Sequence, residues 1–347
     1  MKIAMISFTR NGRNLEKTIA EKLNEAGHEV RWGVKCKELM HDQNAITCSA
    51  KEWTKEQFKD QDVLIFIGAV QIAVRLIACY IESKITDPAV LVVDEKGRYC
   101  IPVLSGHIGG ANEMAEEISR MMGAVPVITT ATDINQKWAV DVFAKKNHLY
   151  IEDMQKAKQI SADVLEGRQI KVSIEGGIKQ VEGVLPEELE IVSETYENPD
   201  IYIGIYKNQQ QKKALRLVPQ IVTVGIGCKK GISSVQIESL VDKILKESHI
   251  NKASVGKIAS IDLKKNEEGL LAFCSKYNIE PEFYPAEELK QVKGEFSASA
   301  FVKSITGVDN VCERSAAHAG GTLRIRKRAE NGVTAAFAWN NWRIEFE

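Results

Sequence analysis

Apolar and polar positions alternate with two different periods along the first part of the chain, which predicts strands and helices in turn. Residues 2–8 (KIAMISF) form a mostly apolar, strand-like run. Apolar residues then recur three or four positions apart over 15–26, a helical spacing, and Gly27 ends the helix. The run VLIFIG at 63–68 predicts a second strand, and a helix follows over 70–82.

The pattern then changes from alternating strand and helix to a pair of adjacent strands. Residues 89–104 (AVLVVDEKGRYCIPVL) predict a hairpin that turns at Glu95–Arg98, where Gly97 can adopt a positive φ. A helix over 111–122, a strand at 125–129 and a helix over 134–147 complete this unit. Because a hairpin pairs its strands antiparallel, we expect a mixed sheet.

The rest of the chain divides into two further regions. Residues 150–217 are rich in Glu, Lys and Gln and contain short alternating stretches such as QIKVSI, which predict a β-rich module. From 218 strands and helices alternate again, with the strands QIVTVGIG, KIASIDL and PEFY around helices at 234–247 and 267–277. The chain then predicts a second hairpin, which turns at Asn331–Gly332.

These patterns predict an α/β protein with two α/β/α layered domains joined by a small β-rich middle module. We place the first domain at 1–149, with a mixed sheet, the middle module at 150–217 and the second domain at 218–347.

Composition narrows the possible functions. The formal net charge is −1, so no basic field attracts nucleic acid, and no apolar run reaches the about 20 residues that span a membrane. Seven cysteines without a pairing or metal-binding pattern suggest free thiols in a reducing compartment, and no secretion signal precedes the first strand. We therefore expect a cytoplasmic protein with neither nucleic acid nor membrane as partner.

The stretch LSGHIGGANE (104–113) lies between a predicted strand and a predicted helix. In open α/β sheets ligands bind outside the carboxyl ends of strands, and the glycines let a ligand approach the backbone. His107 is a candidate general base, Ser105 a candidate hydrogen-bonding group, and Gly109, Gly110 and Asn112 are candidate binding residues. The alternative is structural, with Gly110 capping the helix and Glu113 completing the cap.

The stretch ITTATD (128–133) is rich in hydroxyl groups at the end of a predicted strand. Its threonines, Thr129, Thr130 and Thr132, are candidate ligand contacts. Asp133 and Gln136 have the spacing of a capping box, so we favour a structural role for Asp133 over ligand contact.

Two further loops follow strands of the second α/β domain. VGIGCKKGISSVQ (224–236) offers Gly225, Gly227, Cys228, Lys229 and Lys230 as an anion site, with Ser233 and Gln236 as a helix cap. Its glycine spacing is not that of a dinucleotide fingerprint. In ASIDLKKNEEG (259–269), Asp262 and Lys264 alternate onto one face of the predicted strand, so both could reach one cleft as binding residues. The alternative for them is a surface ion pair, and Asn266 is the expected helix cap. The basic run RIRKR (324–328) is typical of a solvated edge strand.

Taken together and in this order, these stretches resemble one family. LSGHIGGANEMAEEI, VPVITTATD, VTVGIGCKKGISS, ASIDLKKNEEGLL and FSASAFVKSITGVDNVCERSAA are similar to the cobalamin-biosynthesis family CbiG. The C-terminal third also resembles the CobE proteins of the aerobic route, so the second domain is expected to be CobE-like. Members of CbiG often have a glycine where this chain has Val70 or Gln71.

The resemblance implies an activity, the hydrolysis of cobalt-precorrin 5A. The substrate would be a cobalt corphin with acetate and propionate arms and a δ-lactone, which the enzyme opens with water before acetaldehyde leaves. The cobalt would arrive with the substrate, so no protein cofactor or metal is expected. We expect loops of both α/β domains to face this substrate. His107 would be the base, and Ser105 and the Gly109–Gly110 backbone would donate to the oxyanion.

Two other functions remain open from the sequence. The protein could bind tetrapyrrole intermediates and pass them to neighbouring pathway enzymes without catalysis, through transient contacts. It could also bind a nucleotide at its Gly-x-Gly stretch. Glu313 is a second catalytic candidate, although we favour a solvated helix position for it.

Overall fold

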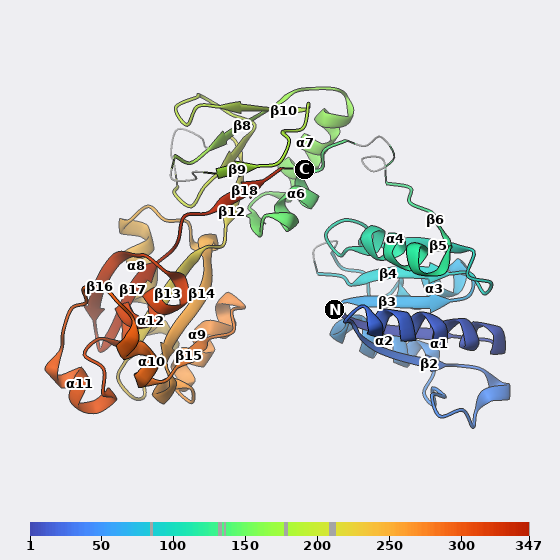
Figure 1. Ribbon diagram of the computed structural model, residues 1–347, viewed down its shortest axis with the longest axis horizontal. Helices are drawn as coiled ribbons and strands as arrows, with labels where there is room; N and C mark the ends of the chain where they lie inside the picture. The colour runs from blue at the N-terminus through green and yellow to red at the C-terminus, as the bar shows by residue number, and fades with distance from the viewer. Residues whose placement is uncertain (84–85, 131–133, 135–136, 177–179, 208–212, 347) are drawn as a thin grey trace. The chain divides into compact units, whose positions relative to one another are not determined.

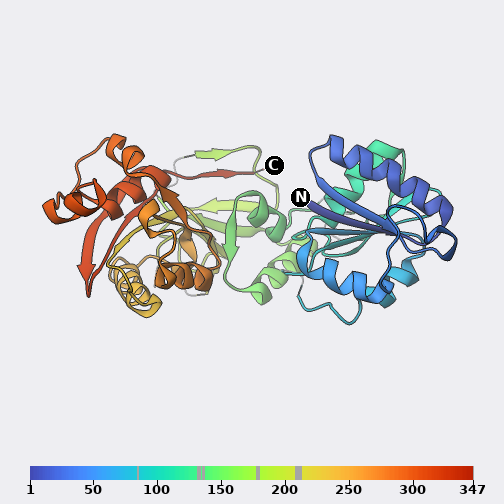
Figure 2. The same ribbon diagram turned by 90° about the horizontal axis from the view of Figure 1, so that it is seen from below.

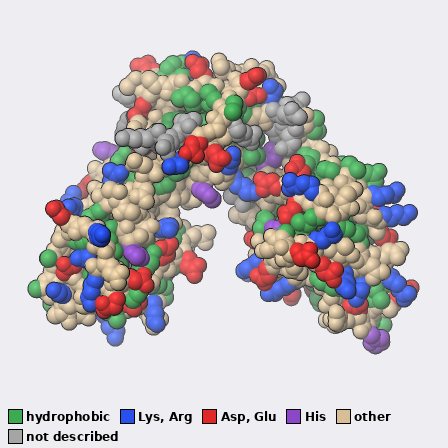
Figure 3. All heavy atoms as spheres, viewed as in Figure 1, with side chains coloured by type: hydrophobic (Ala, Val, Ile, Leu, Met, Phe, Trp, Pro, Cys, Tyr) green, Lys and Arg blue, Asp and Glu red, His purple; other side chains and the backbone are tan. Residues whose placement is uncertain are grey.

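A computed structural model describes residues 1–346 except 84–85, 131–133, 135–136, 177–179 and 208–212. The chain forms two compact units, Met1–Lys137 and Trp138–Glu347, which are described separately (Figure 1). Acidic and basic side chains are interspersed over the visible face of each unit, in agreement with the near-zero net charge (Figure 3).

The first unit is built on a mixed six-stranded sheet with the order β2-β1-β3-β4-β5-β6. The first four of these strands run parallel, β5 runs antiparallel to β4 and so confirms the predicted hairpin, and β6 runs parallel to β5. Their bounds are β1 Lys2–Ser7, β2 Glu29–Val34, β3 Val63–Ile67, β4 Ala89–Val93, β5 Tyr99–Leu104 and β6 Val125–Pro126.

Helices cover both faces of this sheet (Figure 2). Helices α1 (Arg10–Glu25) and α4 (Ala111–Met122) pack on one face, and α2 (Ala50–Asp60) and α3 (Val70–Ile77) on the other. A short 3₁₀ helix, η1 (Lys37–Leu39), follows β2. The strands β3 and β4 are buried on both sides, which explains their continuous apolar sequences.

The second unit begins with a five-stranded sheet in the middle of the chain, in the order β10-β8-β11-β12-β7. Helices α6 (Val140–Lys146) and α7 (Met154–Leu165) contribute to its core. A two-stranded ribbon, β18 with β9, adds the last strand of the chain to the same region. The strand bounds are β7 Leu149–Ile151, β8 Ile170–Ile174, β9 Gln180–Glu182, β10 Leu189–Val192, β11 Ile201–Ile203, β12 Leu215–Pro219 and β18 Arg343–Glu345.

The C-terminal part of this unit has a second five-stranded sheet, in the order β15-β14-β13-β17-β16. Helices α8 and α9 pack on one face, and α10, α11 and α12 lie on the other. The bounds are β13 Val222–Cys228, α8 Ser234–Glu247, η3 Lys252–Ser254, β14 Val255–Ile261, η4 Asp262–Lys264, α9 Glu268–Tyr277, β15 Glu282–Tyr284, α10 Ala286–Gln291, α11 Ala300–Thr306, α12 Val311–Gly320, β16 Leu323–Glu330 and β17 Val333–Ala338.

The structure confirms the predicted fold class of layered α/β domains around a β-rich middle region. The hairpin at Asn331–Gly332 is present, and both residues have positive φ (48° and 82°). The strand that carries RIRKR is the edge strand β16. Over the residues that the structure describes, no helix is long and apolar enough to cross a membrane. All seven cysteines are free thiols.

Candidate functional site

The loop that contains Ser105 and His107 is tightly folded. Ser105 has a positive φ of 55°, and its hydroxyl donates to the carbonyl oxygen of Asp87 at 3.1 Å. The Ser105 carbonyl in turn accepts from the amide of Ala111 at 3.1 Å. Ser105 therefore joins the loop to the segment before β4 and to the start of α4, and the half-buried His107 lies on the loop that it holds.

The glycines of this loop are required by its geometry. A Cβ on Gly109 would lie 2.4 Å from the Cβ of Ser105, so any other residue would open the loop. Gly110 caps α4 with a φ of 85°, as the capping interpretation predicted, and its amide donates to the carbonyl of His107 at 3.0 Å. The Gly110 amide is thus used within the loop in this conformation, which leaves Gly109 as the remaining backbone donor of the predicted pair.

The structure brings the loop together with the threonine-rich stretch. The buried Asn112 donates from Nδ2 to Oγ1 of Thr130 at 3.1 Å, whereas Thr129 is exposed. Thr132 lies outside the described residues, as do Asp133 and Gln136 with their proposed cap.

This loop lies at the opposite end of the sheet from the one expected, which was the end where the parallel strands finish. Because β5 runs antiparallel to β4, the carboxyl end of β5 lies at the end of the sheet where β1, β3 and β4 begin. The hydrogen bond from Ser105 to Asp87, which precedes β4, shows the same. The rule that ligands bind at the carboxyl ends of strands therefore does not apply to this loop. That rule assumes parallel strands, whose carboxyl ends all lie at one end of the sheet.

A pocket of about 650 Å³ lies in the C-terminal part of the second unit. It collects five of the residues predicted to bind substrate, namely Gly227, Cys228, Lys229, Lys230 and Lys264. Residues from α11, the start of α12 and the β16–β17 hairpin complete it. Its volume is within the range of about 300 to 1,000 Å³ that is usual for ligand pockets.

The two glycines of the Gly-x-Gly stretch have different surroundings. Gly225 is buried beneath α12, and a Cβ there would lie 1.9 Å from the carbonyl oxygen of Cys312. Gly227 lines the pocket, and its carbonyl accepts from the hydroxyl of Thr334 at 3.0 Å. The first glycine thus allows the helix to approach the strand closely, and the second is part of the pocket wall.

The predicted arrangement of Asp262 and Lys264 was wrong. Both residues lie in η4 and not in the strand, so they do not alternate across a strand face. The Lys264 ammonium pairs instead with Glu267 at 3.1 Å, and Asp262 is outside the pocket lining. The cap of α9 is Glu267 and not Asn266. The sequence favoured a longer strand because the apolar residues Ile261 and Leu263 continue its alternation.

The environment of the Cys228 thiol disfavours a role as nucleophile. Its side chain is half-buried, and burial raises the pKa of the thiol above its ordinary value although Lys264 opposes the shift. The thiolate, which is the reactive form, is therefore disfavoured near neutral pH. Cys228 contributes shape to the pocket.

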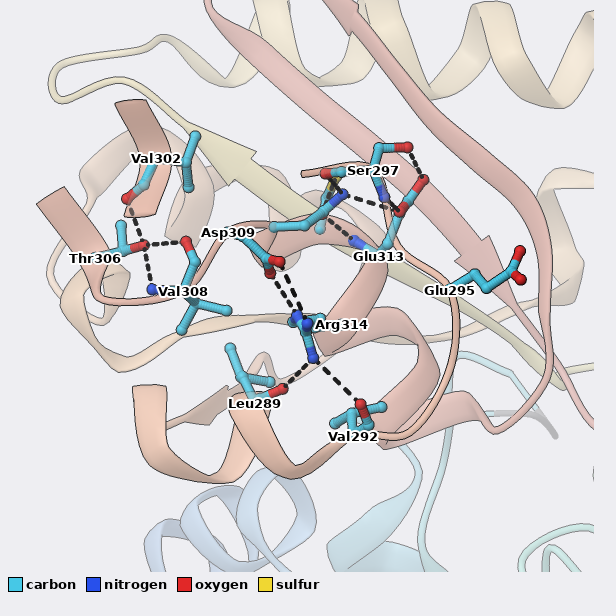
Figure 4. Close-up of polar contacts among 12 residues, drawn as sticks. Leu289, Val292, Glu295, Ser297, Val302, Thr306, Val308, Asp309, Glu313 and Arg314 are labelled. Carbon is cyan, nitrogen blue, oxygen red and sulfur yellow. Dashed lines mark hydrogen bonds and ion pairs between the residues drawn. The ribbon is translucent and has the colours of Figure 1, made fainter. Parts of the chain in front are cut away.

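The favoured interpretation of Glu313 was also wrong, because this residue is fully buried and not solvated. Its carboxylate accepts from the amide and hydroxyl of Ser297, at 2.7 and 3.0 Å (Figure 4). It also accepts from Nδ2 of Asn310 (2.9 Å) and from the amide of Lys327 (2.8 Å). Asn310 and Lys327 both line the pocket. Glu313 thus holds the side chain of Asn310 and the backbone of Lys327, both of which line the pocket.

Within the described ranges, no group of three or more His, Cys, Asp or Glu side chains is arranged to hold a metal ion.

Comparison with known proteins gives matches over most of the chain. Three family models match, described as Cobalamin synthesis G N-terminal over 52–133, Cobalamin biosynthesis central region over 138–219 and Cobalamin synthesis G C-terminus over 222–338. The protein called cobalt-precorrin-5A hydrolase in Priestia megaterium is 34% identical over 82% of this chain and 79% of its own. The protein of that name in Salmonella typhimurium is 32% identical over 81% of this chain and 82% of its own.

Two solved structures also match this chain, both with TM-scores below 0.5. The crystal structure of a cobalamin biosynthesis protein G homolog from Sulfolobus solfataricus is 25% identical, with a TM-score of 0.41 over 97% of this chain and 96% of its own. The structure of CobE from the cobalamin pathway is 26% identical, with a TM-score of 0.32 over 34% of this chain and 88% of its own. On the identity and coverage of the sequence relatives, this chain belongs to the cobalamin biosynthesis protein G family, CbiG.

Proposed function

We propose that this protein is a cobalt-precorrin-5A hydrolase of cobalamin biosynthesis. The observation that carries the proposal is that two proteins of this name match more than four fifths of the chain at 32% and 34% identity. Because these relatives are named for a reaction, they favour catalysis over passive delivery of an intermediate. The substrate is then a cobalt corphin whose cobalt belongs to the substrate, and the protein needs no cofactor of its own.

The reaction divides into two steps with different requirements. Water adds to the lactone carbonyl, the ring C–O bond breaks, and a carboxylate and a free hydroxyl result. Loss of the hydroxyl proton then lets the adjacent C–C bond break, so that acetaldehyde leaves and the electron pair passes into the macrocycle. The first step needs a base and a donor to the oxyanion, and the second needs a base.

We propose that His107 is the general base that activates the water. An imidazole has an ordinary pKa of about 6.5, suited to proton transfer near neutral pH. His107 is half-buried on the loop that leads to Asn112, and Asn112 contacts Thr130. The Gly109 amide is the proposed oxyanion donor. Ser105 positions the loop through its hydrogen bond to the carbonyl oxygen of Asp87. Gly109, Asn112 and the threonines would contact the lactone side of the substrate.

The decisive experiment follows acetaldehyde release from cobalt-precorrin 5A. Wild-type protein should release acetaldehyde, and His107→Ala should lower kcat by about 100-fold or more, the usual loss for a general base. His41→Ala, which changes an exposed histidine of the same unit, is the matched control. Release by wild type with an unchanged rate in His107→Ala would disprove the role of His107, and no release by wild type would disprove the activity.

We also propose that the protein acts in the cytoplasm on this small molecule, without nucleic acid or membrane as partner. Transient contact with neighbouring pathway enzymes would suit a labile substrate. Such contacts would appear as cross-links to those enzymes in cell extracts that depend on the presence of the intermediate.

A further inference from the structure

We infer that the pocket of the C-terminal part binds the edge and one face of a carboxylate-bearing tetrapyrrole, with helix α11 as its apolar wall. The inference rests on the proposed function and adds a location to it. Four of the residues that make this pocket, Phe301, Ile305, Lys327 and Asn310, were not among the binding residues predicted from the sequence.

Helix α11 presents large apolar side chains to solvent at this pocket. Phe301 and Ile305 line the pocket and are 69% and 62% exposed, and their spacing of four residues places them on one helix face. Val302 packs inward against the core of Ile261, Leu289, Val308 and Val311. Exposed apolar side chains grouped beside a pocket commonly mark a binding site.

The helix is fixed in place while that face stays uncovered. The Ser299 hydroxyl caps its first turn by accepting from the amide of Val302 at 3.4 Å. At its other end the Thr306 hydroxyl donates to the carbonyls of Val302 and Val308, at 2.8 and 3.0 Å (Figure 4). The apolar wall is therefore held by its own polar contacts and does not depend on an occupant.

The same pocket is bordered by basic side chains. Lys229 and Lys230 are exposed at the end of β13, Lys327 comes from β16, and Lys264 from η4. Among the described lining residues Glu330 is the one acid, and it pairs with Lys243 at 2.6 Å. Lys264 is partly neutralised by Glu267, which leaves Lys229, Lys230 and Lys327 as the main carboxylate partners.

Charge complementarity decides the occupant. The chain as a whole has a net charge of −1, so this concentration of lysines is local. A tetrapyrrole with acetate and propionate arms has apolar faces and an anionic edge, which match an apolar helix face bordered by lysines.

The test measures the affinity for uroporphyrin I, a planar tetrapyrrole whose edge carries only acetate and propionate arms, by fluorescence titration of the full chain. Phe301→Ala with Ile305→Ala should weaken binding about tenfold or more. Lys229→Gln with Lys230→Gln should weaken it by a similar factor and flatten its dependence on salt.

Matched controls change similar residues outside the pocket. Val235→Ala replaces another exposed apolar residue, and Lys246→Gln with Lys293→Gln removes the same charge from the surface. Both controls should bind like wild type. Wild-type affinity in the two pocket variants, equal weakening in the controls, or no binding by wild type would each overturn the inference.

Activity measurements separate this inference from the proposed reaction. His107→Ala should bind uroporphyrin I like wild type and lose acetaldehyde release. If wild type binds the porphyrin through these residues but releases no acetaldehyde, the proposed reaction fails and the pocket stands. If wild type is active and the pocket variants keep both affinity and KM, the pocket fails, and a protein partner would be the better occupant of α11.

Discussion

At the scale of single residues, the sequence identified side chains near strand ends better than it identified their roles. Five of the predicted binding residues do meet in one pocket, because glycines and lysines after a strand are a local signal. Glu313 was misjudged because its partners Ser297 and Lys327 lie 16 and 14 positions away. A glutamate near a helix start looks the same in sequence whether it is solvated or buried.

Replacing Glu313 should therefore be costly. In Glu313→Ala, donors of Ser297, Asn310 and Lys327 lose their buried acceptor. We therefore expect a loss of about 3 kcal/mol in the free energy of unfolding. Glu313→Gln, which keeps one acceptor oxygen, should lose less. Urea denaturation measures both, with Glu268→Ala as an exposed control. Equal, small losses in all three variants would contradict the buried network.

A second buried carboxyl makes the first unit sensitive to pH. Glu16 is fully buried beside Ser7 Oγ (2.5 Å), and burial raises the pKa of its carboxyl from 4.5 to about 8. The folded state therefore favours the protonated form. Its stabilising contribution is complete below the unfolded pKa near 4.5 and is lost as the pH rises through 8.

Wild type should accordingly lose on the order of 3 kcal/mol more than Glu16→Gln between pH 5 and about 9, since one pKa unit corresponds to about 1.4 kcal/mol. The glutamine has no proton to lose, so its urea midpoint should vary much less over this range. Parallel pH profiles for the two proteins would show that Glu16 is not protonated in the folded state.

At the scale of elements, strongly periodic segments were predicted well. Helix α8 has the predicted bounds, and its Ser233–Gln236 capping box is present. Strand β2 was missed because it alternates exposed and half-buried residues before its buried end. Helix α2 was missed because it buries only Thr54 and Phe58. Of the predicted helix over 134–147, α6 covers Val140–Lys146 and packs in the core of the middle sheet, whereas 135–136 lie outside the described residues.

The contact between β13 and α12 depends on one small residue. Gly225→Ala would place a methyl group 1.9 Å from the carbonyl oxygen of Cys312, so strand and helix would have to separate. We expect a loss of about 3 kcal/mol or more in stability, visible as a lower melting temperature. An unchanged melting temperature would show that the helix can move at little cost.

At the scale of the whole molecule, one core is assembled from distant parts of the sequence. The middle sheet buries Trp138 and Phe143 from before its first strand, and Ile344 and Phe346 from the end of the chain. Phe143 and Phe346 stack with ring centroids 5.0 Å apart. The sequence alone placed Ile344 and Phe346 in the C-terminal domain, because no local pattern predicts that the chain returns to an earlier sheet.

The end of the chain should therefore control the stability of the middle region. Ile344→Ala with Phe346→Ala should cost about 5 kcal/mol, because both side chains are almost completely buried. Arg343→Ala with Glu345→Ala changes the exposed residues of the same strand and should cost less than about 1 kcal/mol. Protease cleavage within the middle region measures the effect, and equal cleavage of both variants would contradict this core assignment.

The position of β18 also has a consequence for the order in which the protein is made. The ribosome synthesises the middle sheet before the C-terminal sheet, yet the strand that completes the middle core emerges after the C-terminal sheet. The nascent middle region must therefore wait, with part of its apolar surface open, while more than a hundred further residues are translated and fold. During that interval it is a natural client for a ribosome-associated chaperone.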